Sequence, residues 1–227
     1  ECTKADNSET RLYSPAAYII NGNTDGKIKL TKTFEGYEEG EAPNGVSLSG
    51  IQFKLQYYDE NEGTKKFLQD GQGNDITATT DANGYATSEN IPYGEYYLYE
   101  VTKFDNYIGI DNLQIIDVLP GQTINYTVEN KIKRGKIEIS KIWEDTNDQQ
   151  GIVEFKLERQ NAENEDLPYT VTVRTDKDTG IATAENIPYG TYKITEIRGK
   201  DGWYTAAAED IAPITINSSN TGYAKIT

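Results

Sequence analysis

The segment Asn90-Ile91-Pro92-Tyr93-Gly94-Glu95-Tyr96-Tyr97-Leu98-Tyr99-Glu100 occurs twice in this chain, the second time as Asn186-Ile187-Pro188-Tyr189-Gly190-Thr191-Tyr192-Lys193-Ile194-Thr195-Glu196. Side chains alternate between the two faces of a β-strand, so Tyr96, Leu98 and Glu100 share one face. Tyr192, Ile194 and Glu196 do the same in the second copy. Each face is apolar except for its glutamate. Because a carboxylate is rarely buried without a partner, each glutamate predicts a polar partner elsewhere in the core.

A second repeated pattern supplies that partner. Gly26-Lys27-Ile28-Lys29-Leu30-Thr31-Lys32-Thr33-Phe34 matches Gly135-Lys136-Ile137-Glu138-Ile139-Ser140-Lys141-Ile142-Trp143. Alternation places Lys32 on the face of Ile28, Leu30 and Phe34, and it places Lys141 among the matching apolar residues. Each copy therefore carries one lysine on an inward strand face.

An asparagine completes the set in the first copy. In Ile124-Asn125-Tyr126-Thr127-Val128-Glu129-Asn130 the even-numbered residues share one face, so Asn130 lies inward with Val128. The first copy thus brings a lysine, a glutamate and an asparagine to three inward strand faces. Burial favours the neutral forms of the lysine and the glutamate, and a neutral amine is a nucleophile.

The length and the turn pattern predict an all-β chain of two domains. The 227 residues contain short Val/Ile/Thr/Tyr-rich runs separated by turns such as Asp81-Ala82-Asn83-Gly84 and Pro120-Gly121. We place the domains at 26–132 and 135–227, with residues 1–25 as an N-terminal segment left from a preceding domain. The short join, Lys131 to Arg134, predicts that the two β-sandwiches follow each other end to end.

The composition excludes several classes of function. The formal net charge is −15, from 22 basic and 37 acidic residues, which opposes binding to nucleic acid or to an anionic membrane. There is no histidine and a single cysteine, Cys2, so we expect no metal site, no cofactor and no internal disulfide. No apolar run has the length of a membrane span.

These motifs resemble those of tandem Cna B-type domains, the immunoglobulin-like modules of Gram-positive surface adhesins and sortase-assembled pilins. Lys141-Ile142-Trp143-Glu144-Asp145-Thr146-Asn147-Asp148 is similar to the opening segment of that family, and Pro188-Tyr189-Gly190-Thr191-Tyr192 to its second hallmark. The first copy carries the same signals with Phe34 in place of Trp143. The resemblance implies two immunoglobulin-like β-sandwiches on the surface of a cell.

The resemblance also implies a chemistry for the three inward residues. In this family a lysine on the first strand and an asparagine on the last form a spontaneous isopeptide bond, assisted by a buried acid. Residue by residue, this gives Lys32, Glu100 and Asn130 in the first domain, and Lys141 with Glu196 in the second. The asparagine partner of the second domain falls just beyond Thr227. The simpler alternative is an ordinary buried salt bridge between each lysine and its glutamate.

Two functions remain open at this point. The chain is either the stalk of a cell-wall-anchored extracellular adhesin or ancillary pilin, or a module that binds a host matrix protein through loops such as Phe34 to Val46. Its partners would then be other domains or subunits of an adhesin or pilus, or that host protein. An enzyme acting on an external substrate is not expected, since histidine is missing and the acids are buried. A large exposed aromatic patch would favour the binding module.

Overall fold

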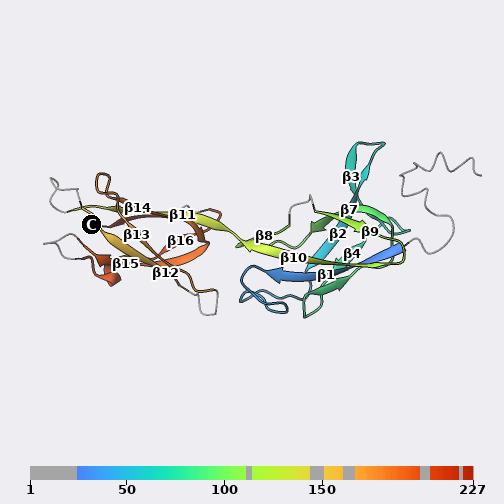
Figure 1. Ribbon diagram of the computed structural model, residues 1–227, viewed down its shortest axis with the longest axis horizontal. Coiled ribbons are helices and arrows are strands. Elements are labelled where there is room, and N and C mark those ends of the chain that lie inside the picture. The colour runs from blue at the N-terminus through green and yellow to red at the C-terminus, as the bar shows by residue number, and fades with distance from the viewer. Residues whose placement is uncertain are drawn as a thin grey trace, which may run out of the picture. The chain divides into compact units, whose positions relative to one another are not determined.

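The computed structural model describes residues 25–110, 114–143, 151–160, 167–199, 205–219 and 222–226. The regular structure of these residues is β apart from one 3-10 turn, η3 (Ala208–Asp210) (Figure 1). The predicted all-β class is confirmed. Residues 1–24 of the N-terminal segment, which include Cys2, lie outside the described residues.

The contacts divide the chain into two compact units. The first consists of Glu1–Lys103 with Gly109–Asn130, and the second of Phe104–Ile108 with Lys131–Thr227. Residues 104–108 belong to the second unit because β8 (Tyr107–Ile108) pairs with Lys131 and Ile132, the last two residues of β10 (Thr123–Ile132).

The first unit contains two sheets. One is built around β1 (Asp25–Phe34), which lies between β10 and β5 (Tyr85–Thr87), and β6 (Ile91–Pro92) also pairs with β1. The other has the order β3 (Thr64–Phe67), β2 (Gln52–Asp59), β7 (Gly94–Glu100) and β9 (Ile115–Val118), and β4 (Thr77–Thr79) also pairs with β2.

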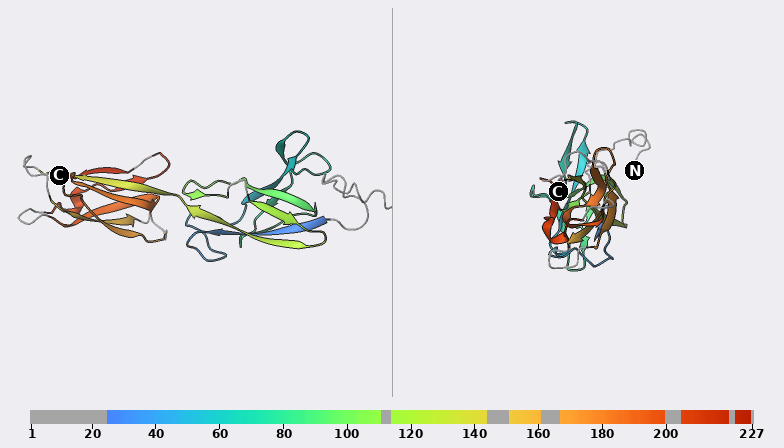
Figure 2. Two further views of the ribbon diagram at one scale, coloured as in Figure 1. Left: turned by 45° about the horizontal axis from the view of Figure 1, so that its top comes forward. Right: turned by 90° about the vertical axis from the view of Figure 1, so that its left-hand side faces the viewer.

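The second unit repeats this plan with fewer strands. One sheet has the order β14 (Ile181–Pro188), β11 (Arg134–Lys141) and β17 (Tyr223–Ile226). The other has the order β13 (Thr170–Arg174), β12 (Glu154–Gln160), β15 (Gly190–Arg198) and β16 (Ile214–Ile216). The left view in Figure 2 shows the strands of each unit in two layers.

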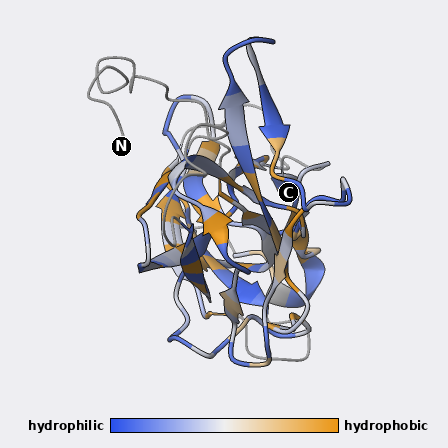
Figure 3. Ribbon diagram, turned by 90° about the vertical axis from the view of Figure 1, so that its right-hand side faces the viewer, coloured by the Kyte–Doolittle hydropathy of each residue, from blue (hydrophilic) through white to orange (hydrophobic). Residues whose placement is uncertain are grey.

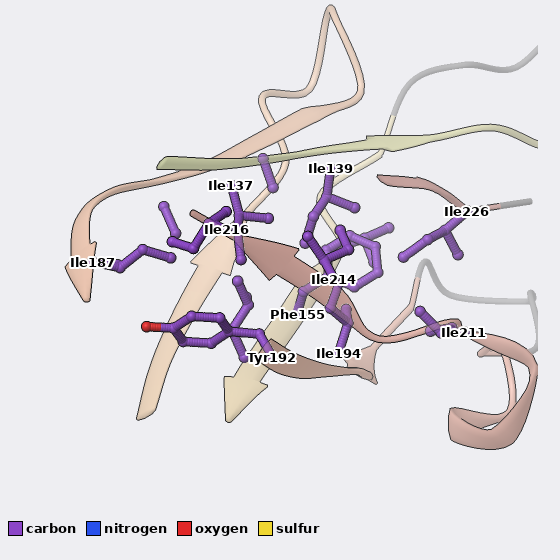
Figure 4. Packing of buried hydrophobic residues seen from close by; sticks show 14 of the residues in the cluster. Ile137, Ile139, Phe155, Ile187, Tyr192, Ile194, Ile211, Ile214, Ile216 and Ile226 are labelled. Atoms are coloured by element: carbon purple, nitrogen blue, oxygen red, sulfur yellow. The ribbon is translucent and has the colours of Figure 1, made fainter. Parts of the chain in front are cut away.

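The strand faces alternate as the sequence predicts. In β1 every second residue from Gly26 to Phe34 is buried, and in β7 the buried positions are Tyr96, Leu98 and Glu100. Coloured by hydropathy, the apolar segments lie on strands and the polar ones dominate the turns (Figure 3). Figure 4 shows the result in the second unit, where Ile137, Ile139 and Phe155 pack into one apolar core.

The duplicated Ile-Pro-Tyr-Gly stretch forms the same corner in both units. Gly94 and Gly190 have φ of 150° and 151°, a backbone conformation that favours glycine. Beyond this corner the buried Tyr96 hydroxyl donates to Pro92 O at 2.9 Å, and the Tyr192 hydroxyl donates to Pro188 O at 2.7 Å. The hydrogen bond satisfies a buried polar group and anchors the inward strand that ends in the glutamate.

Candidate functional site

Three strands of the first unit bring Lys32, Glu100 and Asn130 together. Lys32 lies on β1 and Asn130 on β10, and these two strands pair in parallel with Lys32 opposite Val128 and Phe34 opposite Asn130. Glu100 is the last residue of β7 in the facing sheet. All three residues are buried, with 0%, 0% and 1% of their surface exposed.

Glu100 contacts both other members of the cluster through one oxygen. Its Oε1 lies 3.7 Å from Lys32 Nζ, and it accepts a hydrogen bond from Asn130 Nδ2 at 3.1 Å. The ammonium group also donates to the carbonyl oxygens of Thr33 and Val128, at 3.0 and 3.4 Å. The ring of Phe34 covers it, with its centroid 4.4 Å from Nζ.

One side-chain oxygen of Glu100 and the side-chain oxygen of Asn130 make no hydrogen bond with the described residues. Glu100 Oε2 and Asn130 Oδ1 are buried and have no hydrogen-bond partner within the described part of the chain. Both face the α-carbon of Gly109, where a side chain would overlap Glu100 Oε2 and would lie within 4 Å of Asn130 Oδ1. A residue other than glycine at this position would force the carboxyl group of Glu100 to move.

Burial governs the protonation of Lys32. Loss of hydration lowers the pKa of its amine from 10.5 to about 8, against the opposing attraction of Glu100 and the more distant Glu129. A minor fraction of the amine is therefore neutral near physiological pH, far more than for a lysine in water. This is the form that can act as a nucleophile.

The second unit contains the same lysine and glutamate in a different arrangement. Lys141 Nζ donates to Glu196 Oε2 at 3.1 Å, and the backbone N–H of Ala206 donates to the same oxygen at 3.2 Å. Glu196 Oε1 has no partner among the described residues. Here a backbone donor stands beside the carboxylate, whereas in the first unit Gly109 offers only its α-carbon.

The strand register defines where an asparagine of the second unit would lie. Lys141 pairs with Ile226 on β17, as Lys32 pairs with Val128 on β10, so the position matching Asn130 is two residues after Ile226. Thr227 lies outside the described residues. Asn217 accepts a hydrogen bond from Ser219 N in an exposed local turn.

Alternation in the sequence identified every charged and amide residue of these clusters. It missed Gly109 and Ala206, which come from irregular segments after the inward glutamates. Their residue types do not indicate a role in the sequence. Gly109 matters because it has no side chain beside Glu100, and Ala206 because its backbone N–H donates to Glu196.

No group of three or more His, Cys, Asp or Glu side chains in the described ranges is arranged to hold a metal ion. None of the helices in those ranges is long and apolar enough to cross a membrane.

Comparison with protein families gives one match, and it occurs twice. The model for SpaA, a prealbumin-like fold domain, matches residues 26–132 and again residues 135–227. No curated protein matches the chain.

The chain is also similar to solved structures. The Bacillus anthracis TIE protein is 22% identical with a TM-score of 0.55, over 89% of this chain and 33% of that chain. A streptococcal ancillary pilin is 20% identical with a TM-score of 0.38, over 91% of this chain and 64% of that chain. GBS52, the minor pilin of Streptococcus agalactiae, is 19% identical with a TM-score of 0.34, over 87% and 94% of the two chains. This chain therefore spans only a third of the length of the TIE protein chain.

Proposed function

Because the chain belongs to the SpaA prealbumin-like fold family, we propose that it is a structural stalk whose first unit locks itself with an isopeptide bond between Lys32 and Asn130. The observation that carries this proposal is the burial of a lysine, a glutamate and an asparagine in one apolar core with a shared Glu100 Oε1. The unit would then act as a covalently closed module and not as an enzyme on external substrates.

The proposed reaction uses the neutral amine of Lys32 as the nucleophile. Nζ attacks Asn130 Cγ, while a proton on Glu100 moves to Asn130 Oδ1 and stabilises the developing charge. Collapse of the tetrahedral intermediate breaks the Cγ–Nδ2 bond, and Nδ2 leaves as ammonia after accepting the proton that Lys32 gives up. The proton on Oδ1 returns to Glu100 as the carbonyl group forms again. One amine and one amide are consumed, and one secondary amide and one ammonia are formed.

The two oxygens without a hydrogen-bond partner, Glu100 Oε2 and Asn130 Oδ1, are consistent with a proton on Glu100 during the proposed reaction. An ionised carboxylate and an amide oxygen are both acceptors, so both would stay unsatisfied in the dry core. A proton on Glu100 Oε2 converts one of them into a donor. When Lys32 is in its neutral form as well, the site avoids the cost of burying two charges.

An ordinary buried salt bridge is the competing interpretation. It accounts for Lys32 and Glu100, but it needs no asparagine. The hydrogen bond from Asn130 to the same Glu100 oxygen, together with the lowered pKa of Lys32, favours the reactive arrangement.

The topology supports the role of a stalk. β1 is the first described strand and β10 is the last strand of the first unit, and they lie side by side in parallel. A bond between residues 32 and 130 would span 98 positions of sequence. Tension applied at the two ends of the unit would pass through this bond and bypass the other strands. By analogy with a disulfide that closes a loop of this length, it would add about 4–5 kcal/mol to the free energy of unfolding.

For the second unit we propose a site with its lysine and glutamate in place and its asparagine supplied just beyond Thr227. Lys141 and Glu196 occupy the positions of Lys32 and Glu100 in the repeat. We further propose that the modules, bounded at 26–132 and 135–227, belong to a cell-wall-anchored, extracellular adhesin or ancillary pilin. Other domains or subunits of that assembly would be the partners.

The loop from Phe34 to Val46, the alternative binding site for a host matrix protein, has few exposed apolar side chains. Residues 34–46 expose the carboxylates of Glu38, Glu39 and Glu41, but Tyr37 is half-buried. A host matrix protein would thus meet mainly negative charge at this loop.

Intact mass spectrometry after full denaturation tests the proposed bond. We expect a mass below the sequence mass by one ammonia, and a branched peptide that joins Lys32 to Asn130 after digestion. The Asn130→Ala variant is the control and should have its full sequence mass. Recovery of Lys32 and Asn130 in separate linear peptides from the unmodified protein would refute the proposal.

A further inference from the structure

The chain between Glu100 and Gly109 has little regular structure of its own. Within residues 101–110, which we call the covering segment, only β8 is a strand. The segment nevertheless ends against the reacting groups, because a side chain at Gly109 would overlap Glu100 Oε2 and would lie within 4 Å of Asn130 Oδ1. Irregular segments are more mobile than the strands that they connect. A contact this close therefore needs groups that hold the covering segment in place.

Lys103 holds the covering segment near its start. Its ammonium group reaches back and donates to the backbone oxygen of Glu100 at 2.6 Å, and it lies 5.2 Å from the ring centroid of Tyr99 on the same strand. Hydrogen bonds from a charged donor are stronger than those between neutral groups. Lys103 thus fixes the direction in which the chain leaves β7, the strand that carries Glu100.

Lys133 holds the covering segment further along. Its ammonium group donates to Asp105 O at 2.7 Å, and its backbone N–H donates to Asn106 O at 2.9 Å. The next two residues of the segment form β8, which pairs with the end of β10. Gly109 is the residue that directly follows β8. The bonds of Lys133 and the pairing of β8 together fix where the α-carbon of Gly109 lies.

We propose that Lys103 and Lys133 are positioning residues for the formation of the isopeptide bond, an inference that rests on the crosslink proposed above. They act through the covering segment and not on the reacting atoms. By holding that segment, they keep Gly109 against the carboxyl group of Glu100 and keep this group directed at Asn130.

The position of Gly109 matters to the reaction for two reasons. Its α-carbon occupies the space beside Glu100 Oε2, where a water molecule would otherwise compete with Asn130 Oδ1 for the proton of the acid. It also limits the directions that the carboxyl group can take. A misplacement of reacting groups by about 1 Å can slow a reaction on the order of a hundredfold.

The two lysines contribute less to the stability of the fold than to this placement. The bond from Lys133 to Asp105 O is exposed, and the bond from Lys103 to Glu100 O is only partly buried. Water can replace a donor at such positions, so the net loss of stability is small when the donor is removed. Loss of the lysines should therefore slow crosslinking while the unit remains folded.

Crosslinking kinetics of the full chain test the proposal. Lys103→Met/Lys133→Met removes both ammonium donors, and we expect the rate at which freshly synthesised protein loses ammonia to fall by about tenfold or more. Lys103→Arg/Lys133→Arg keeps a charged donor at both positions and should retain most of the rate. The matched control, Lys54→Met/Lys136→Met, makes the same change of charge at two other paired lysines and should crosslink normally.

A double-mutant cycle separates positioning from a general loss of stability. In the Gly109→Ala background the acid is already displaced, so the two methionine substitutions should slow the reaction by a much smaller factor than in the unmodified chain. Independent losses would multiply instead. Far-UV circular dichroism reports whether each variant is folded. If the double methionine variant is unfolded, Lys103→Met and Lys133→Met are measured singly, and each should slow the reaction by a smaller factor.

The possible failures of the inference and of the proposed bond are distinguishable. A normal rate in the folded methionine variants, an arginine pair as slow as the methionine pair, an equal loss in Lys54→Met/Lys136→Met, or losses that multiply with Gly109→Ala would overturn the positioning role and leave the crosslink intact. If the unmodified chain loses no ammonia, the proposed bond is overturned, and this inference with it.

Discussion

Asn130 Nδ2 donates a hydrogen bond to Glu100 Oε1 at 3.1 Å, and the second oxygen of each group faces Gly109 without a hydrogen-bond partner in the described part of the chain. An asparagine and a glutamate that meet only for packing would normally satisfy both oxygens. In the proposed bond formation, a proton on Glu100 would turn one of these two acceptors into a donor. The predictions below follow from this relationship and from its counterpart in the second unit.

Replacing the acid should stop bond formation without unfolding the unit. Glu100→Gln keeps the shape of the side chain but cannot deliver a proton, so we expect the full sequence mass by mass spectrometry and a folded far-UV circular dichroism spectrum. Loss of the bond should lower the free energy of unfolding by about 4–5 kcal/mol. Glu95→Gln, on the exposed face of the same strand, is the matched control. A variant at Glu100 that crosslinks as fast as the unmodified protein would remove the assigned role.

A methyl group at Gly109 should slow the same reaction. Gly109→Ala pushes against Glu100 Oε2, so we expect the rate of crosslinking in freshly synthesised protein to fall by about tenfold or more, since small misplacements of reacting groups are costly. Gly71→Ala, where a side chain meets nothing within 4 Å, should have no effect. Shortening the acid in Gly109→Ala/Glu100→Asp should recover part of the rate. If Gly109→Ala crosslinks normally, the close approach does not position the acid.

The burial of Lys32 predicts how stability depends on pH when the bond is absent. The pKa of the amine is 10.5 in the unfolded chain and about 8 in the folded one, so between these values the unfolded state binds more protons. Stability should therefore rise with pH across this window, and the penalty should be fully present below about pH 8. In Asn130→Leu, chemical denaturation should detect an increase on the order of 3 kcal/mol. Asn130→Leu/Lys32→Met should lack it, and an equal rise in both variants would assign the effect to other groups.

The buried tyrosine hydroxyl should stabilise the corner before the inward glutamate. Tyr96→Phe removes the donor to Pro92 O, and we expect a loss of about 1 kcal/mol in the free energy of unfolding. Urea unfolding in the Glu100→Gln background, where no bond masks the change, is the measurement. Tyr58→Phe, at an exposed position, should be neutral. A neutral Tyr96→Phe would show that packing alone holds the corner.

The second unit should be the weaker one in the chain of 227 residues. Lys141 and Glu196 are buried as a pair with no asparagine hydrogen-bonded to them among the described residues, an arrangement whose desolvation offsets its attraction. Limited proteolysis under mild heating should cut between Gly135 and Thr227 before it cuts the first unit. Appending one asparagine directly after Thr227 should produce a second loss of ammonia and reverse that order, whereas appending alanine should not. First cleavage within the first unit of the unextended chain would contradict this ranking.

The sequence alone was enough to predict which polar residues lie on the inward faces of the strands. Strand alternation is a local property with a period of two residues, so Lys32, Glu100, Asn130, Lys141 and Glu196 could be assigned to inward faces from their neighbours alone. The repeat added the strand plan of the second unit, because two segments with the same pattern bury the same face. The all-β class followed from the same local signals.

Only the tertiary structure decided how those residues meet. The parallel register of β1 with β10, the gap that Gly109 leaves beside Glu100, and the donor that Ala206 brings to Glu196 all join segments far apart in sequence. Alternation states which side of a strand a residue occupies, but packing across the sandwich decides which atom it touches, and that contact sets its protonation and its reactivity.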